Sequence, residues 1–111
     1  MIVNLPSKRV RATPDFLAEF SELSEGTQEA FGQLLEAYLR GERLPAKCFK
    51  TFWIDGKIKV LEFKVRDRSG NWRSIAVLEA GWLVLIHAFH KKSQELPDKV
   101  KRTIRARVRR A

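Results

Sequence analysis

The sequence contains a single cysteine, Cys48, and it has no long apolar segment. One cysteine cannot form a disulfide within the chain, so the fold requires no oxidising compartment. The longest apolar run, residues 82–86, is far shorter than the roughly 20 residues that cross a bilayer. The N-terminal residues lack the continuous apolar core of a secretory signal. These absences predict a cytoplasmic protein without a membrane partner.

Acidic residues are scarce in the second half of the chain. Residues 1–56 hold 7 Lys and Arg against 8 Asp and Glu, whereas residues 57–111 hold 15 against 5. The formal net charge of +9 therefore comes entirely from the second half. Such a one-sided excess indicates a polyanionic partner, and RNA is the partner that we expect.

The first half of the sequence predicts helices. At 111 residues with 44% hydrophobic side chains, residues 1–111 are expected to form one domain. Apolar side chains at helical spacing predict one helix that begins at Thr13-Pro14 and a second that ends near Gly41. The two would form an αα-hairpin with one buried face. A short strand is expected within residues 1–12.

From Ile58 onward the apolar period changes to two, which predicts strands. We expect strands over 58–66, 72–78 and 82–89 and turns at 67–71 and 80–81. The last strand is apolar on nearly every residue, so it should be central, with Trp82 and His87 in the core. Residues 49–54 are either a strand before the Asp55-Gly56 turn or an apolar loop under the helices.

A basic helix with a thin apolar stripe is expected to begin at Pro97-Asp98. Mutual repulsion among its cations would destabilise it without a counterion partner, which favours contact with RNA phosphates. The predicted fold class is α+β, with the αα-hairpin packed on a small antiparallel sheet and a basic C-terminal helix.

Four motifs follow one another in the second half: Glu62-Phe63-Lys64, a turn around Gly70, Trp72-Arg73, and LIHAFHKKSQELP from Leu85 to Pro97. In this order they resemble the RelE/HigB group of toxins from bacterial type II toxin–antitoxin systems, most closely the phage-derived HigB branch. The motifs cover about half the chain. The resemblance implies a RelE/ParE-like fold and a toxin that cuts mRNA at the ribosomal A site, and so inhibits translation.

The resemblance also implies partners. The ribosome with its mRNA would be the target, and a small antitoxin of the helix-turn-helix kind would hold the toxin inactive. Operator DNA would be bound only through the complex with that antitoxin. No cofactor and no metal ion are expected, because His87 and His90 have no third ligand at a suitable spacing.

Cleavage of RNA without a metal ion needs a proton acceptor, a proton donor and stabilisation of the charge that develops on the phosphate. Arginine suits the last task, and Arg73 occupies the turn-then-arginine position of the family. His90 is preferred to His87 for proton transfer because it lies beside the lysines. The predicted catalytic residues are Arg73, His90, Lys92 and Lys64. The predicted RNA-binding residues are Arg66, Arg68, Trp72, Lys91, Lys101, Arg102, Arg105 and Arg109.

Two other functions remain open on the sequence. Several relatives carry a catalytic tyrosine near the C-terminus, whereas the only tyrosine here, Tyr38, lies in the apolar stripe of the second predicted helix. A ParE-like gyrase poison or a non-cleaving translation inhibitor would need no such group. A non-enzymatic RNA-binding module would fit the charge and the aromatic side chains equally well.

Overall fold

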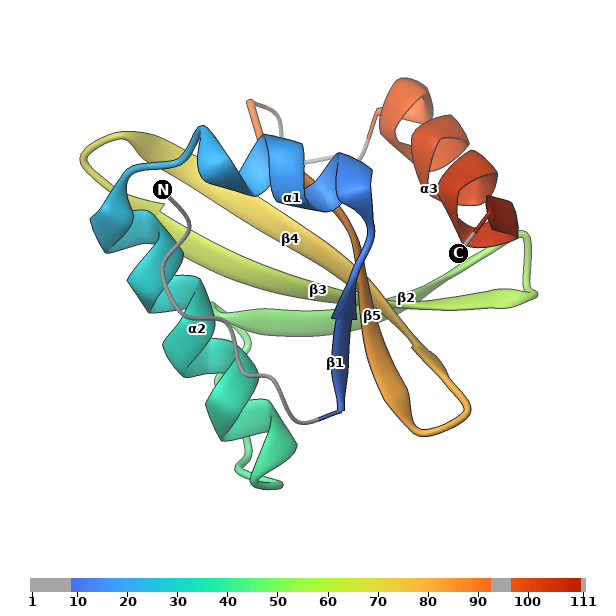
Figure 1. Ribbon diagram of the computed structural model, residues 1–111, viewed down its shortest axis with the longest axis horizontal. Helices are drawn as coiled ribbons and strands as arrows, with labels where there is room; N and C mark the ends of the chain where they lie inside the picture. The colour runs from blue at the N-terminus through green and yellow to red at the C-terminus, as the bar shows by residue number, and fades with distance from the viewer. Residues whose placement is uncertain (1–8, 93–96, 111) are drawn as a thin grey trace.

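The computed structural model describes residues 9–92 and 97–110, and these form three helices and a five-stranded sheet (Figure 1). In chain order the elements are β1 Val10–Ala12, α1 Pro14–Ser21, α2 Glu25–Leu39, β2 Phe49–Ile54, β3 Ile58–Asp67, β4 Gly70–Glu79, β5 Trp82–His90 and α3 Asp98–Arg110. The α+β class is confirmed. Residues 1–8 of the strand predicted near the N-terminus, and residues 93–96 of the last motif, lie outside the described residues.

The sheet has the order β1-β5-β4-β3-β2, and it is mixed. Strands β2 to β5 form an antiparallel meander, whereas β1 pairs in parallel with β5, with Val10 opposite Leu83. The prediction of an antiparallel sheet is therefore wrong at this edge. A parallel neighbour needs a long crossover, and here α1, α2 and strands β2 to β4 lie between the two paired strands in the sequence.

Residues 49–54 form a strand, which settles the alternative that the sequence left open. The turn that follows has Asp55 and Gly56 both at positive φ, 55° and 65°, and such a turn suits the twist of a tight hairpin. The hairpin register places Ile54 opposite Ile58 and Lys50 opposite Glu62. This register fixes one side of the site described below.

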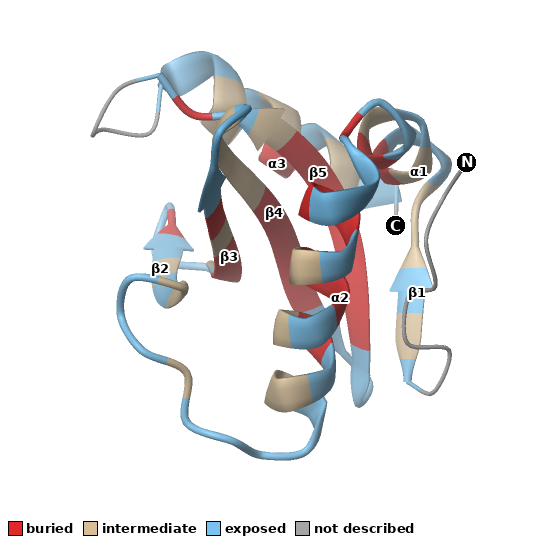
Figure 2. Cartoon of the chain, turned by 90° about the vertical axis from the view of Figure 1, so that its left-hand side faces the viewer, coloured by how far each residue is buried: buried red, intermediate tan, exposed pale blue. Residues whose placement is uncertain are grey.

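Helices α1 and α2 lie on the same face of the sheet, with α1 against β5 and α2 against β3. Thr13 and Ser24 cap their N-termini through side-chain oxygens, as the sequence predicted for Thr13. The rings of Phe20 and Phe31 connect the two helices at 6.1 Å between centroids. Since each helix packs mainly on a strand, the αα-hairpin is only a rough description. Figure 2 shows the buried residues along the middle of β3, β4 and β5.

Helix α3 covers only part of the opposite face. Ile104 is fully buried and packs in one cluster with Val60 of β3, Ile75 of β4 and Ile86 of β5. Alternation then places Glu62, Lys64 and Arg66 on this same face, past the apolar cluster. One half of the face is thus apolar and covered by α3, and the other half carries charged side chains.

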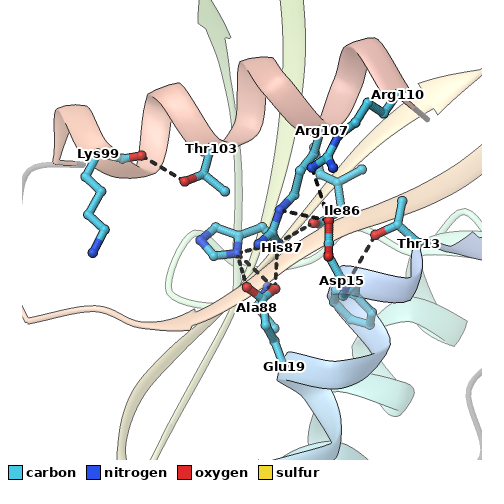
Figure 3. A network of polar contacts seen from close by, with 11 residues as sticks. Thr13, Asp15, Glu19, Ile86, His87, Ala88, Lys99, Thr103, Arg107 and Arg110 are labelled. Atoms are coloured by element: carbon cyan, nitrogen blue, oxygen red, sulfur yellow. Dashed lines mark hydrogen bonds and ion pairs between the residues drawn. The ribbon is translucent and has the colours of Figure 1, made fainter.

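A polar network ties α3 to the rest of the fold (Figure 3). The Glu19 carboxylate of α1 lies 3.0 Å from Nδ1 of His87 and accepts hydrogen bonds from the backbone N–H of Ala88 at 3.0 Å and from Arg107 Nη1 at 2.8 Å. Arg107 also donates to the carbonyl of Ile86 at 3.0 Å. These side chains satisfy backbone groups of β5 beyond the segment that β1 covers. His87 is buried and hydrogen-bonded, as predicted.

Trp82 was predicted to be a core residue, and this prediction is wrong. Its side chain is 38% exposed, and the guanidinium of Arg11 lies 5.1 Å from the ring centroid. Trp82 is the first residue of β5 after the Ala80-Gly81 turn, at the tip of a hairpin. A cation–π contact rather than core packing holds the ring there.

Candidate functional site

The charged half of the α3 face contains a hollow of about 510 Å³, which we call the basic groove. Its lining residues are Lys47, Cys48, Lys64, Arg66, Asn71 and Arg73. Lys64 and Arg73 lie directly opposite each other on β3 and β4, and Arg66 lies opposite Asn71. Lys64 and Arg66, two residues apart on β3, thus line the groove from the same face of the strand. Arg73, which the sequence placed in the same site, joins them.

A buried carboxylate lies between these cations. Like charges directly opposite each other on paired strands are destabilising, as Lys64 and Arg73 would be alone. Glu62 has no exposed surface, and its two oxygens lie 3.5 Å from Lys50 Nζ and 3.3 Å from Arg73 Nε. Arg73 also donates from Nη1 to the carbonyl of Trp72 at 3.1 Å. Glu62 therefore offsets part of the repulsion and holds the guanidinium on one edge.

Lys64 is placed by its backbone and by its side chain. Its backbone N–H donates to the carbonyl of Cys48 at 2.8 Å, and Nζ donates to the carbonyl of Ala46 at 2.9 Å. Burial lowers the pKa of Lys64, the charge of Glu62 raises it, and the nearby cations Lys50 and Arg73 lower it again, so the net change is downward. A lysine with a lowered pKa exchanges protons more readily near neutral pH.

Lys91 belongs to the same group of cations. Its backbone N–H donates to the carbonyl of Asn71 at 2.7 Å, and its side chain is largely buried. Burial lowers the pKa of Lys91, Glu62 opposes the change, and Lys50, Arg73 and Lys64 add to it. Lys92, which the sequence favoured for catalysis, is exposed after the end of β5. The structure thus places Lys91 near Glu62 and its cations, although Lys91 is not among the side chains that line the basic groove.

His90 lies on the other face of the sheet. It pairs with Trp72 across β4 and β5, with the ring centroids 4.8 Å apart, and its imidazole covers Gly70 so closely that an added Cβ there would meet Nε2 at 2.2 Å. Successive residues of a strand alternate, so Trp72 and His90 face away from Arg73. Trp72 packs against the core beneath α1 and α2. The predicted grouping of His90 with Arg73 is not what the structure shows.

The cations of α3 have more internal partners than the sequence suggested. Arg105 binds both carboxylate oxygens of Asp55, at 2.7 and 3.1 Å, and this hydrogen bonding lowers the pKa of Asp55. Arg110 pairs with Asp15 of α1 at 3.2 Å. Helix α3 therefore has counterions within the fold, which weakens the argument that repulsion among its cations requires RNA phosphates. Lys101 is partly exposed, and Arg102 and Arg109 are exposed, as is Arg68 in the β3–β4 turn.

Several residues at the basic groove escaped the sequence analysis: Lys47, Cys48, Lys50, Glu62 and Asn71. Cys48, which the sequence analysis considered only for disulfide formation, lines the hollow. The Asp55-Gly56 turn could have predicted one of these contacts. In a hairpin with this turn, pairing the residues outward along the two strands places Lys50 opposite Glu62. The pairing was not predicted because the sequence left residues 49–54 as either a strand or a loop.

Within residues 9–92 and 97–110, no three side chains of His, Cys, Asp or Glu lie close enough to hold a metal ion. Over the same described residues, no helix combines the length and the apolar composition needed to span a membrane.

The protein is thus an α+β fold with a mixed sheet, which α1 and α2 cover on one face and the cationic helix α3 covers in part on the other. The basic groove lies on the face of α3, and its charge suits a polyanion. Residues 18–109 match the model of the family described as Phage derived protein Gp49-like (DUF891). The chain belongs to this family, which lies within the RelE/HigB-like toxin superfamily. The curated proteins contain no match. The resemblance to toxins is thus confirmed for the superfamily, and a toxin of this kind implies an antitoxin partner.

Proposed function

We propose that the protein is the toxin of a type II toxin–antitoxin system and cuts mRNA on the ribosome without a metal ion. The observation that carries this proposal is the convergence of Lys64, Arg73 and Lys91 around one buried carboxylate in a groove of the sheet. Membership of the toxin superfamily supports the first part of the proposal. The cationic lining supports the second part, because a phosphate backbone is the ligand that such a lining attracts.

The groups of the basic groove match the requirements of the reaction. The 2′-oxygen of the RNA attacks the adjacent phosphorus, the bond to the 5′-oxygen breaks, and a 2′,3′-cyclic phosphate and a 5′-hydroxyl remain. Arg73 stabilises the added negative charge with N–H groups that neither Glu62 nor Trp72 occupies. We assign the two proton transfers to Lys64 and Lys91, whose pKa values are lowered: one accepts the proton of the 2′-hydroxyl, and the other gives a proton to the departing 5′-oxygen.

The surrounding cations extend the surface along which RNA would lie. Arg66 and Lys47 line the groove beside Arg73, and we assign them to neighbouring phosphates. Lys101, Arg102 and Arg109 project from α3, and we assign them to ribosomal RNA. Contacts of this kind release counterions, so binding should weaken steeply as salt is raised.

The proposal is tested by inducing the protein in cells that lack an antitoxin and mapping the 5′ ends of their messages. Arg73→Lys keeps a positive charge beside Glu62 but loses the planar fork that binds phosphate oxygens in pairs. We expect growth arrest and new message ends with the wild type, at least a tenfold loss of ends with Arg73→Lys, and full activity in the control Arg40→Lys. Arg40 lies at the exposed end of α2. Equal cutting by the wild type and Arg73→Lys would contradict the proposal.

A second candidate keeps the fold without the cleavage. Tyr38 packs with the rings of Phe49 and Phe63 at 5.5 and 5.7 Å and lies partly buried against the core. Among the described residues, the lining of the basic groove contains neither tyrosine nor histidine. This favours a ParE-like gyrase poison or a non-cleaving inhibitor of translation. In the same experiment, DNA damage signalling with intact messages would select the first, and arrested translation with intact messages the second. Unimpaired growth with salt-sensitive RNA binding would indicate a non-enzymatic RNA-binding module.

A further inference from the structure

Glu62 is a fully buried carboxylate in the middle of a strand, and neither of its oxygens accepts a hydrogen bond from the described residues. Among the described residues, its ion pairs are those with Lys50 and Arg73, and they compensate in part for its lost hydration. Burying an ion in this way costs several kcal/mol before its partners are counted, and an apolar residue of similar size often stabilises a fold equally well. Glu62 is therefore poorly explained as a device for stability.

The position of Glu62 relative to the basic groove suggests another purpose. Lys50 of β2 and Arg73 of β4 form ion pairs with it, and its charge also acts on Lys64 of β3 and on Lys91 after β5, where it raises the pKa against the effect of burial. Its carboxylate faces the Nε edge of Arg73, and the carbonyl of Trp72 accepts a hydrogen bond from Nη1. The guanidinium is held along one side, and its other N–H groups are left for a ligand.

We propose that Glu62 is a positioning residue of the basic groove: its buried carboxylate anchors the Nε edge of Arg73 so that the guanidinium presents its remaining N–H groups to the RNA phosphate. This inference rests on the proposed function. Glu62 touches no substrate, and it acts through Arg73. Its charge also favours the protonated forms of Lys64 and Lys91, against the burial and the repulsion that favour their neutral forms.

A positioning role and a purely electrostatic role for Glu62 predict different effects on RNA turnover when the charge of Glu62 is removed. Glu62→Gln keeps the shape of the side chain and adds one unit to the positive net charge. Electrostatics alone would make RNA binding tighter and cleavage no worse. A loss of positioning would leave binding equal or tighter while turnover falls, because the guanidinium no longer meets the phosphate in a fixed geometry.

The test compares the wild type, Glu62→Gln and the control Glu79→Gln, which changes an exposed carboxylate on β4. Binding is measured with a short single-stranded RNA, cleavage with translating ribosomes, and the titration of Lys64 and Lys91 by NMR of ¹³C-labelled lysine. For Glu62→Gln we expect at least a tenfold lower kcat, a KM that is unchanged or lower, and lysine midpoints at lower pH. Wild-type kcat or unmoved midpoints in the folded variant would overturn the inference.

The titration needs no cleavage, so the two proposals can fail separately. If the wild type cuts no message, the proposed function fails, and the lysine midpoints alone decide whether Glu62 acts on the groove. If circular dichroism shows that Glu62→Gln is unfolded, Glu62→Asp replaces it, since aspartate keeps the charge and withdraws it by one methylene. We then expect a lower kcat with lysine midpoints close to those of the wild type. Wild-type kcat in Glu62→Asp would overturn the inference.

Discussion

Replacing Glu19 by glutamine removes the negative charge at the centre of the network that joins α1, β5 and α3 (Figure 3). Burial raises the pKa of Glu19, but hydrogen bonds from His87, Arg107 and the backbone N–H of Ala88 outweigh it and lower the pKa from 4.5 to about 2. A carboxyl group with a depressed pKa contributes stability that is fully present above its unfolded value and is lost as the pH falls through its folded value.

The size of the effect follows from this pKa. The interval between 4.5 and about 2 sets an upper limit of about 3 kcal/mol, because one pKa unit corresponds to about 1.4 kcal/mol. The Glu19 side chain is 26% exposed, so solvent screens part of the interaction. After this discount we expect Glu19→Gln to lower the free energy of unfolding by about 1–2 kcal/mol at neutral pH.

Urea denaturation at a series of pH values measures this contribution. The difference in the free energy of unfolding between the wild type and Glu19→Gln should be constant above about pH 5, shrink below pH 4.5, and vanish near pH 2. Glu22→Gln, at an exposed residue that ends the same helix, is the control and should change little. A difference that is as large near pH 2 as at neutral pH would show that the charge of Glu19 is not its cause.

Two further predictions concern the fold that supports the basic groove. Ile104→Ala should lower the free energy of unfolding, measured by urea denaturation, by about 2–4 kcal/mol, because Ile104 is fully buried between α3 and the sheet. The control is Val108→Ala at a partly buried site, and an equally small loss in both variants would contradict the packing of α3 on the sheet. Ala80→Gly should stabilise the protein by about 0.5–1 kcal/mol, because Ala80 has a positive φ of 50°. Ala18→Gly, at an exposed site inside α1, should instead destabilise by about 1 kcal/mol, and stabilisation by both changes would contradict the backbone argument.

Local sequence patterns were sufficient to predict many of the helices, strands and turns. The change of period at Ile58, the turn at Asp55-Gly56 and the cap at Thr13 each identify an element from adjacent residues, and the structure has these elements. The parallel pairing of β1 with β5 left no such pattern, because a strand of three residues pairs with a partner far along the chain. Tertiary context alone determines that pairing.

The site was predictable to a similar extent. Alternation along β3 placed Lys64 and Arg66 on one face, and no knowledge of neighbouring strands was needed. Assigning His90 and Lys91 to faces requires the register between β4 and β5, which pairs Trp72 with His90. The sequence did not provide that register, so His90, which lies on the other face, was grouped with Arg73, and Lys91, which lies near Glu62, was assigned to RNA binding alone.

The most direct test of the proposed activity is to add the purified protein to a defined message on purified translating ribosomes and to analyse both the position and the chemistry of the new ends. Metal-free cleavage in the basic groove predicts cuts within the ribosomal A site, a 5′-hydroxyl and a 2′,3′-cyclic phosphate, and at least a tenfold lower yield with Arg73→Lys. An intact message, 5′-phosphate ends, or an undiminished yield from Arg73→Lys would contradict it.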